Sequence, residues 1–376
     1  MNTIVIGPNH NNTLGLIWSL GEAGHIITLL LYKADNNYVS KSKYVSKVIF
    51  IDHDDDIVKL IKQISADFDK KPAVFVSNDK DATVLNDHAS ELMPYCYFEG
   101  NHFGGNINIY RNKDYGNQLA RECGLNTPKN IAIDAPGQLN EISLNYPIVI
   151  KANNSVHGGK LAMKRCNSEQ MAFDFINNLP EDYFPLQVQE YIEKEYEIML
   201  LGCSLNGGDK LICPIANKKI RHYPHPMGLG SYSESVEVRL NEDLKSLASK
   251  VACYMRAIRY TGLFSAEFLY SKGVYYFLEI NLRNDGTSWL STCSGYNLPD
   301  MLCRSYLGEE VSADDGQFKK MYYMNIMADI HYARKEVGII NWIKLFNKGT
   351  CYSHYNKQDR KPFWHYMKEI VMGHLK

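Results

Sequence analysis

Short apolar strands alternate with helical segments through the first hundred residues, and this alternation constrains the fold most. The predicted strands are Ile4–Ile6, Ile26–Tyr32, Val48–Ile51 and Val74–Val76, and the predicted helices are Leu14–Ala23 and Asp56–Phe68. Such alternation is typical of a parallel sheet whose crossover connections are helical. The chain is therefore predicted to be an α/β protein, with a parallel α/β domain at its N-terminus.

A glycine, Gly7, follows the first predicted strand, as it does in dinucleotide-binding folds. The stretch Gly7–Gly15 reads G-P-N-H-N-N-T-L-G instead of G-x-G-x-x-G, and Pro8 and His10 crowd the position of a pyrophosphate. NAD or FAD binding is therefore disfavoured. Ser77–Asp79 follow another strand at its carboxyl end, where open α/β sheets place ligands. These residues line a substrate pocket or, alternatively, cap the next helix.

Composition and charge narrow the class of protein further. The chain has 376 residues, of which 45% are hydrophobic and 22% are charged, enough for two or three globular domains. A formal net charge of -1 gives no electrostatic reason to expect nucleic acid or a membrane as a partner. The nine cysteines include no C-x-x-C pair, so neither a disulfide framework nor a zinc site is indicated. With reduced thiols and no signal-peptide pattern at Met1–Gly7, we expect a cytoplasmic protein.

The segment Phe277–Gly286, F-L-E-I-N-L-R-N-D-G, predicts a strand that ends in polar and charged side chains. Residues two apart in a strand share a face, so Glu279, Asn281 and Arg283 point the same way. Carboxylate and amide oxygens are ligands for a divalent cation such as Mg²⁺, which usually bridges to substrate phosphates. The guanidinium of Arg283 suits a transferred phosphoryl group or a substrate carboxylate, because it can bind either one in a bidentate way.

A second acid, Glu267, is predicted to reach the same site through a hairpin. The hairpin joins Leu263–Tyr270 to Val274–Asn281 through a three-residue loop, Ser271–Gly273, with glycine in the left-handed position. This register leaves Glu267 and Glu279 diagonal on one face, with backbones ~7–8 Å apart. A two-residue loop would instead put Glu267 on the opposite face. Two facing acids repel without a cation, so the pair predicts a metal site.

The sequence E-I-N-L-R, Glu279–Arg283, resembles the metal-binding strand of the ATP-grasp superfamily, usually written E-x-N-x-R. Leu282 stands where proline often precedes the arginine, a change that leaves the ligands intact. Further motifs follow the family order between Met1 and Asp300. The resemblance implies a pre-ATP-grasp α/β domain at residues 1–109, a first lobe with a glycine-rich lid loop at 110–187, a second lobe with the metal site at 188–310, and a C-terminal extension at 311–376.

Lysines and a glycine-rich loop are the phosphate-binding elements that the resemblance implies. Lys151 closes the apolar strand Y-P-I-V-I-K-A, where a solvated surface lysine would be unusual. Lys113 matches a second phosphate-contacting residue, with a solvated lysine at a helix start as the alternative. The loop residues that would close over the γ-phosphate are Ser155, Gly158, Gly159 and Lys160, with a plain hairpin turn as the alternative.

The segment V-Q-E-Y-I-E-K-E-Y-E-I-M-L matches the hinge where the family binds adenine. Glu190 and the main chain of Tyr191 and Ile192 would hold the exocyclic amine. For the ribose hydroxyls, Glu195 fits the motif better than Glu197, but strand alternation puts both on one face and leaves the choice open. A charged strand edge would explain these acids without a ligand.

Two later segments are less specific. Lys218 and Arg221 lie in a basic stretch. In similar enzymes such a stretch directs a cation toward the phosphates or toward the acceptor's carboxylate. The alternative interpretation of this stretch is a surface loop without a binding role. The tail matches no family motif, and its aromatic residues Trp342, Phe346 and Trp364 are predicted to pack on the core rather than contact a partner. Helices are predicted around Leu302–Leu307 and Phe318–Tyr332.

The resemblance implies an ATP-dependent ligase that uses Mg²⁺ or Mn²⁺. A bound carboxylate would attack the γ-phosphate of ATP, giving an acylphosphate and ADP. An amine would then attack the acylphosphate, giving an amide and phosphate. The sequence is similar to carboxylate–amine ligases such as D-aspartate ligase. It is also similar to relatives of the carbamoyl-phosphate-synthase domains. Bicarbonate activation and a non-catalytic ATP-binding regulatory protein are the alternatives. The expected partners are a small-molecule carboxylate and amine, without nucleic acid or membrane, and a homodimer is compatible with the resemblance.

Overall fold

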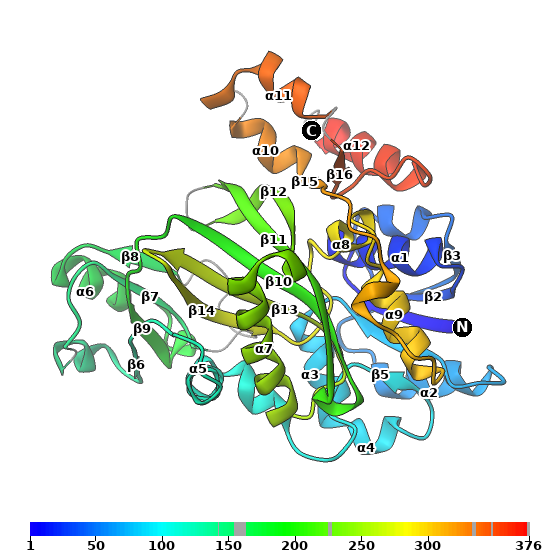
Figure 1. The fold of residues 1–376 in the computed structure, drawn as a ribbon, viewed down its shortest axis with the longest axis horizontal. Coiled ribbons are helices and arrows are strands. Elements are labelled where there is room, and N and C mark those ends of the chain that lie inside the picture. Colours follow the sequence, from blue (N-terminus) through cyan, green and yellow to red (C-terminus); the bar gives the residue numbers. More distant parts are fainter. Residues whose placement is uncertain (142, 154–162, 225–227, 333–335, 347–348, 374–376) are drawn as a thin grey trace. The chain divides into compact units, whose positions relative to one another are not determined.

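The computed structural model describes residues 1–141, 143–153, 163–224, 228–332, 336–346 and 349–373 (Figure 1). The chain divides into two compact units. Unit 1 consists of Met1–Gly105, Ile198–Ser265 and Asn281–Lys376, and unit 2 consists of Asn106–Glu197 and Ala266–Ile280. Within the described residues, we find no helix of the length and apolar character that a membrane span needs.

A five-stranded sheet opens unit 1 and confirms the predicted α/β class (Figure 1). Its strands run in the order β3-β2-β1-β4-β5, and each neighbouring pair is parallel. Its elements are β1 (Asn2–Gly7), α1 (Asn11–Glu22), β2 (Ile26–Tyr32), β3 (Val45–Ile51), α2 (Ile57–Ala66), β4 (Ala73–Val76), α3 (Asp79–Asp87), α4 (Ala89–Leu92) and β5 (Tyr97–Phe98). Three of these elements lacked a prediction, namely α3, α4 and β5; β5 has only two residues, too few to show a periodicity.

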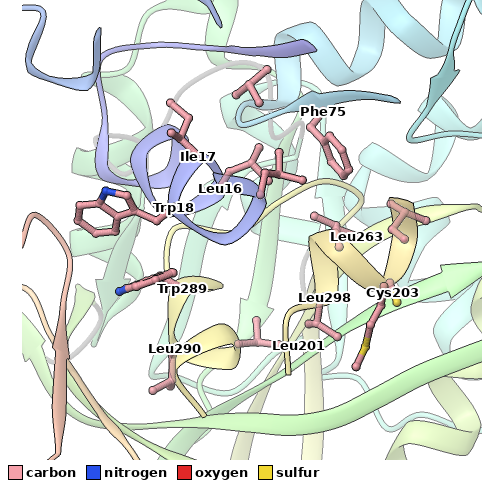
Figure 2. Close-up of a cluster of buried hydrophobic side chains, with 14 of the residues drawn as sticks. Leu16, Ile17, Trp18, Phe75, Leu201, Cys203, Leu263, Trp289, Leu290 and Leu298 are labelled. Atoms are coloured by element: carbon pink, nitrogen blue, oxygen red, sulfur yellow. The ribbon is translucent and has the colours of Figure 1, made fainter. Parts of the chain in front are cut away.

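Helix α1 lies in the hydrophobic core of unit 1 (Figure 2). It begins after His10, whose Nδ1 accepts a hydrogen bond from the Asn12 amide at 3.3 Å. It ends before Gly24, which has a φ of 81° that favours glycine. Figure 2 shows Trp18 of α1 facing Trp289, with the two ring centroids 5.2 Å apart. Residues Asn11 to Leu20 are all buried, so this part of the helix is covered by the protein on every side.

A seven-stranded sheet has the order β14-β13-β10-β11-β12-β15-β16, and the boundary between the units passes through β10, β13 and β14. The strands are β10 (Tyr196–Leu205), β11 (Lys210–Tyr223), β12 (Leu229–Glu237), β13 (Gly262–Ser271), β14 (Val274–Asn281), β15 (Tyr322–Met324) and β16 (Thr350–Tyr352). The helices of unit 1 in this part of the chain are α7 (Glu242–Ala257), α8 (Trp289–Cys293), α9 (Leu298–Tyr306), α10 (Ile326–Tyr332), α11 (Ile339–Leu345) and α12 (Lys361–Gly373).

The C-terminal segment packs within unit 1. The buried carboxylate of Asp359 accepts hydrogen bonds from Trp18 Nε1 (3.0 Å), the Ser42 hydroxyl (2.5 Å) and the Lys43 amide (3.1 Å). These donors belong to α1 and to the chain that leads into β3. The end of the chain is thereby tied to the first sheet.

The predictions for the tail are correct in part. The helix predicted near Leu302–Leu307 is α9, but Phe318–Tyr332 forms strand β15 followed by α10 instead of one helix. Trp342 is buried, as predicted for a core residue, whereas Trp364 is 64% exposed and that prediction is wrong. Trp364 faces outward because α12 buries its opposite side, which includes Pro362.

Unit 2 contains a four-stranded antiparallel sheet in the order β6-β9-β7-β8. Its elements are α5 (Lys113–Glu122), β6 (Asn130–Ile133), β7 (Ile148–Ala152), β8 (Lys164–Cys166), α6 (Glu169–Asn177) and β9 (Leu186–Glu190). Alternate residues of β7, Ile148 and Ile150, face the core of this unit together with Ile176 of α6. The intervening positions, among them Lys151, are half-buried.

Candidate functional site

Two lysines of unit 2 meet at the end of strand β7. Helix α5 begins at Lys113, because the side chain of Asn112 accepts a hydrogen bond from a backbone amide of the first turn. The Lys113 amide donates to the Asn153 carbonyl (3.0 Å), and its ammonium donates to the Ala152 carbonyl (2.9 Å). The start of α5 therefore brings Lys113 beside the strand end that carries Lys151.

The charge of Lys151 is poorly accommodated by the protein alone. Burial, followed by the positive charge of Lys113, lowers the pKa of Lys151 to about 7. The carboxylates of Glu279 and Asp114 oppose this shift. Two neighbouring ammonium groups are stabilised when an anion binds to both. This part of unit 2 therefore suits a polyphosphate.

Strand β7 leads into the predicted glycine-rich loop. Asp114 holds the strand end, since its carboxylate accepts hydrogen bonds from Asn153 (2.5 Å), Asn130 (3.1 Å) and Gln187 (3.3 Å). Sequence reasoning did not single out Asp114, whose only signal was its position next to Lys113. The predicted loop residues Ser155, Gly158, Gly159 and Lys160 lie outside the described residues.

The predicted adenine segment begins at the end of β9. The Glu190 amide donates to the Lys129 carbonyl (2.9 Å), and Oε1 of Glu190 accepts from the Lys129 amide (2.8 Å). The Tyr191 amide donates to the carbonyl of the residue before β7 (3.2 Å), and the Arg165 guanidinium lies 4.0 Å from the Tyr191 ring centroid. These contacts order the backbone that leads to Ile192.

Glu195 and Glu197 have different surroundings. Glu195 precedes β10, and its carboxylate accepts a hydrogen bond from the Lys272 amide (2.7 Å) in the turn between β13 and β14. Glu197 is buried, and its carboxylate pairs with Lys194. Glu195 therefore stabilises a turn, whereas the carboxylate of Glu197 lies inside the unit.

The hairpin that carries Glu267 and Glu279 has a two-residue turn, so the predicted three-residue loop is wrong. Strand β13 ends at Ser271 and β14 begins at Val274. Lys272 and Gly273 have φ values of 48° and 83°, the left-handed pair that a type I′ turn requires. Such turns match the right-handed twist of the strands.

The observed turn changes the relation between the two acids. The rings of Phe268 and Phe277 lie 5.7 Å apart and those of Tyr270 and Tyr275 lie 4.8 Å apart, as expected when Ser271 pairs with Val274. Counting along this register puts Glu267 opposite Leu278 and Glu279 opposite Ala266. Regular alternation along this register would place the two carboxylates on opposite faces. Asn281 nevertheless donates to the hydroxyl of Ser265 (3.1 Å), a residue that the same register would put on the other face, so the alternation is interrupted between Ser265 and Phe268. The joint metal binding of the two acids stays a prediction.

In unit 1, Arg283 forms an ion pair at the edge of the parallel sheet. Its Nε and Nη2 donate to the two carboxylate oxygens of Asp79, at 3.1 and 2.8 Å. It also donates to Oδ1 of Asn281 (3.2 Å) and to the Asn284 carbonyl (3.0 Å). Asn281 donates from Nδ2 to the Ser265 hydroxyl (3.1 Å), which orients its amide. The predicted substrate residue Asp79 and the predicted metal strand therefore meet.

Asparagines connect this edge to the start of α1. Asn12 donates to the Ser77 carbonyl (2.8 Å) and to the Asn284 carbonyl (3.1 Å), and Asn284 donates back to Oδ1 of Asn12 (2.5 Å). Asn11 donates to the Gly286 carbonyl (3.1 Å). Sequence reasoning missed this network, although the run of asparagines at the carboxyl end of a strand was an available signal.

Lys218 and Arg221 both lie on β11 of unit 1. Lys218 is opposite Glu234 in the antiparallel pair with β12. The guanidinium of Arg221 donates to both oxygens of Asp329, at 2.8 and 2.5 Å. Asp329 is fully buried and also accepts from Trp342 Nε1 (2.9 Å). Arg221 therefore joins β11 to α10.

Comparison with known proteins identifies a family for part of the chain. A model of the ATP-grasp domain matches residues 118–295. The carbamoyl phosphate synthase large chain of Saccharolobus solfataricus is 21% identical over 200 residues, which are 52% of this chain and 19% of that protein. The formate-dependent phosphoribosylglycinamide formyltransferase of Bacteroides fragilis is 28% identical over 190 residues, 48% of this chain and 46% of that protein. The chain thus spans less than half the length of these relatives.

A solved structure extends the fold match. The ADP complex of an N5-carboxyaminoimidazole ribonucleotide synthetase superposes with a TM-score of 0.66 at 16% identity, covering 89% of this chain and 84% of that one. At this identity the match concerns the fold alone. The resemblance inferred from the motifs is confirmed by the family model: the chain contains an ATP-grasp domain, formed by residues 118–295.

Proposed function

We propose that this protein is an ATP- and Mg²⁺-dependent ligase that activates a carboxylate as an acylphosphate for attack by an amine. The observation that carries the proposal is the pair Lys113 and Lys151 in unit 2, with Glu279 acting on the same ammonium. Two cations and an acid in a partly buried corner suit a polyphosphate that is bound together with a metal ion. The products would be an amide, ADP and phosphate.

The residues of unit 2 would bind the nucleotide. Lys113 and Lys151 would neutralise phosphate oxygens, and the backbone at Tyr191 and Ile192 would hold the adenine amine, with Glu190 ordering that backbone through Lys129. The loop residues Ser155, Gly158, Gly159 and Lys160 would cover the γ-phosphate. Because these groups position and stabilise charge, the reaction requires no side-chain nucleophile.

For the ribose hydroxyls we now favour Glu197 over Glu195. The carboxylate of Glu195 already accepts the Lys272 amide and supports the hairpin turn. Glu197 is buried beside Lys194, where a ribose could share its carboxylate. The surroundings of the two acids support this assignment.

The donor set suits magnesium. Glu267 and Glu279 would offer carboxylate oxygens, and Asn281 would offer its amide oxygen, which accepts a hydrogen bond from Arg283 (3.2 Å). A bound Mg²⁺ would neutralise phosphate charge and polarise the γ-phosphoryl group. Mn²⁺ would suit the same oxygen ligands.

Three cationic residues of unit 1 are assigned to the substrates. Arg283, which Asp79 orients, would bind the carboxylate or the phosphoryl group that it attacks. Lys218 would add positive charge near the acceptor. Arg221 would act indirectly, by holding β11 against α10, because its guanidinium is paired with Asp329.

Bicarbonate activation is the second candidate. One relative is a carbamoyl phosphate synthase large chain, whereas the name of another states that it depends on formate, a carboxylate. The same lysine and glutamate side chains would serve either substrate, an organic carboxylate or bicarbonate. A non-catalytic ATP-binding protein is less well supported, because such a protein has little need of the complete donor set.

The test incubates the full chain with ATP, Mg²⁺, hydroxylamine and pools of carboxylates, including amino acids and bicarbonate. We expect ADP and hydroxamate from one pool, and loss of both in Glu279→Gln. ADP formed with bicarbonate alone, without hydroxamate, would replace the proposal by the second candidate. ATP binding without ADP in any pool would contradict a ligase.

A further inference from the structure

His10 lies at the edge of unit 1 where the loop after β1 meets the segment after β14. Its side chain is exposed, while its Nδ1 accepts the Asn12 amide at the start of α1 (3.3 Å). A ring nitrogen that accepts an N–H carries no proton, so the neutral imidazole carries its hydrogen on Nε2. His10 therefore offers one fixed donor to a ligand.

The charges of a cation and an anion act on this donor. Although the side chain reaches the surface, the surrounding protein removes part of its water; this desolvation, followed by the positive charge of Arg283, lowers the pKa of His10, and the negative charge of Asp285 opposes the shift. Because Nδ1 accepts the Asn12 amide, the ring carries a single proton and no charge. The hydrogen bonds of Asn12 with Asn284 hold the two segments together, so these three groups keep their relative positions.

Asp285 has one oxygen turned to the protein and one that is held only weakly. Oδ1 accepts the amide and the hydroxyl of Thr287, at 2.8 and 2.7 Å. Oδ2 receives a long contact of 3.4 Å from the Ser265 hydroxyl. An ammonium group would make a shorter, charge-assisted hydrogen bond to that oxygen.

We propose that this edge binds an α-amino acid, whose carboxylate receives the Nε2 hydrogen of His10 beside Arg283 and whose ammonium binds Asp285. As the substrate of a ligase, this amino acid rests on the proposed function. Arg283 supplies one positive charge, and Asp79 and Asp285 supply two negative charges, so the site disfavours a ligand with a net negative charge, which a zwitterion does not carry. A phosphate ester, with nearly two negative charges near pH 7, would be repelled.

The experiment measures binding to the full chain by titration calorimetry, without turnover. The probes are the standard L-amino acids, D-alanine and D-aspartate, with ribose 5-phosphate as the phosphorylated comparison. For each amino acid that binds, two analogues follow: the amine that lacks its carboxylate and the acid that lacks its ammonium. We expect an amino acid to bind at least tenfold more tightly than either analogue and than ribose 5-phosphate.

Two substitutions separate the two contacts. In His10→Asn the amide oxygen can still cap α1, but the donor at the Nε2 position is lost. We expect about tenfold weaker binding of the amino acid and unchanged binding of the amine analogue. In Asp285→Asn the acceptor for Thr287 remains and the charge is lost. We expect about tenfold weaker binding of the amino acid and no loss of affinity for the analogue without ammonium.

His10→Gln, whose amide nitrogen reaches the Nε2 position, should restore the affinity lost in His10→Asn. Equal affinities of His10→Asn and the unmodified protein, or tighter binding of ribose 5-phosphate, would overturn the inference. If His10→Asn fails to fold, Asp285→Asn still decides. Amino acid binding without ADP release would support this site while contradicting the ligase. ADP release with a different acid, and no amino acid binding, would overturn this site alone.

Discussion

At the scale of single residues, the proposal depends on how Lys151 is charged. Burial and Lys113 lower the pKa of Lys151 to about 7, so the unliganded protein binds this proton weakly. Polyphosphate would stabilise the charged form. We expect Lys151→Met to raise the KM for ATP at least tenfold, because the length of the side chain is kept while its charge is lost. Steady-state ADP release measures this, with the exposed Lys210→Met as control; equal effects of the two would contradict the assignment.

Glu197 and Glu195 give a second test at this scale. Since Glu195 is bonded to the Lys272 amide, Glu195→Gln should leave ATP affinity within about twofold, as its amide oxygen can still accept that hydrogen bond. Glu197→Gln should weaken ATP binding about tenfold, because a charged acceptor for the ribose hydroxyls is lost. Titration calorimetry with ATP compares the two. The reverse order of effects would return the ribose to Glu195.

At the scale of elements, the turn between β13 and β14 carries the acids. Gly273 has a φ of 83° and open space around its Cα, so the cost of a methyl group there is conformational. Gly273→Ala should lower the free energy of unfolding by about 1 kcal/mol. Urea unfolding measures it, with Gly137→Ala as a control at a glycine that also has open space and no left-handed φ. Equal stability of both variants would argue against the type I′ turn.

The elements also show what the sequence could predict. Strand and helix periodicity predicted the parallel sheet, because each strand buries a local apolar run. The turn was wrong because Ser271–Gly273 is compatible with two loop lengths, and the predicted metal site selected the wrong one. The partners of the Arg283–Asp79 ion pair are 204 residues apart in sequence, and those of the Arg221–Asp329 pair are 108 apart. A local sequence pattern therefore could not predict either ion pair.

At the scale of the whole chain, its last segment returns to the first sheet of unit 1, and His354 lies where it does so. The imidazole stacks on Tyr366 of α12, 4.1 Å between centroids, and its Nδ1 is 2.7 Å from the Ser353 hydroxyl. Burial, followed by the positive charge that His10 gains when it is protonated at low pH, lowers the pKa of His354 from 6.5 to about 3. Below pH 6.5 the unfolded chain therefore binds a proton that the folded chain does not.

The free energy of unfolding should accordingly fall as the pH drops from about 6.5 toward 3, by about 1.4 kcal/mol per pH unit from this group. His354→Phe keeps an aromatic ring and cannot titrate. We expect urea unfolding at pH 7 and pH 5.5 to show a smaller loss of stability in His354→Phe, by about 1 kcal/mol. Parallel losses in both proteins would mean that His354 is protonated in the folded state.

The central claim is the transfer of a phosphoryl group to a carboxylate, and oxygen isotopes test it most directly. The carboxylate that supports ADP release is labelled with ¹⁸O, and the released phosphate is analysed by mass spectrometry. An acylphosphate forms when a carboxylate oxygen bonds to phosphorus, and attack by the amine leaves that oxygen on phosphate. We predict one ¹⁸O atom in each phosphate. Unlabelled phosphate released together with amide would contradict the account.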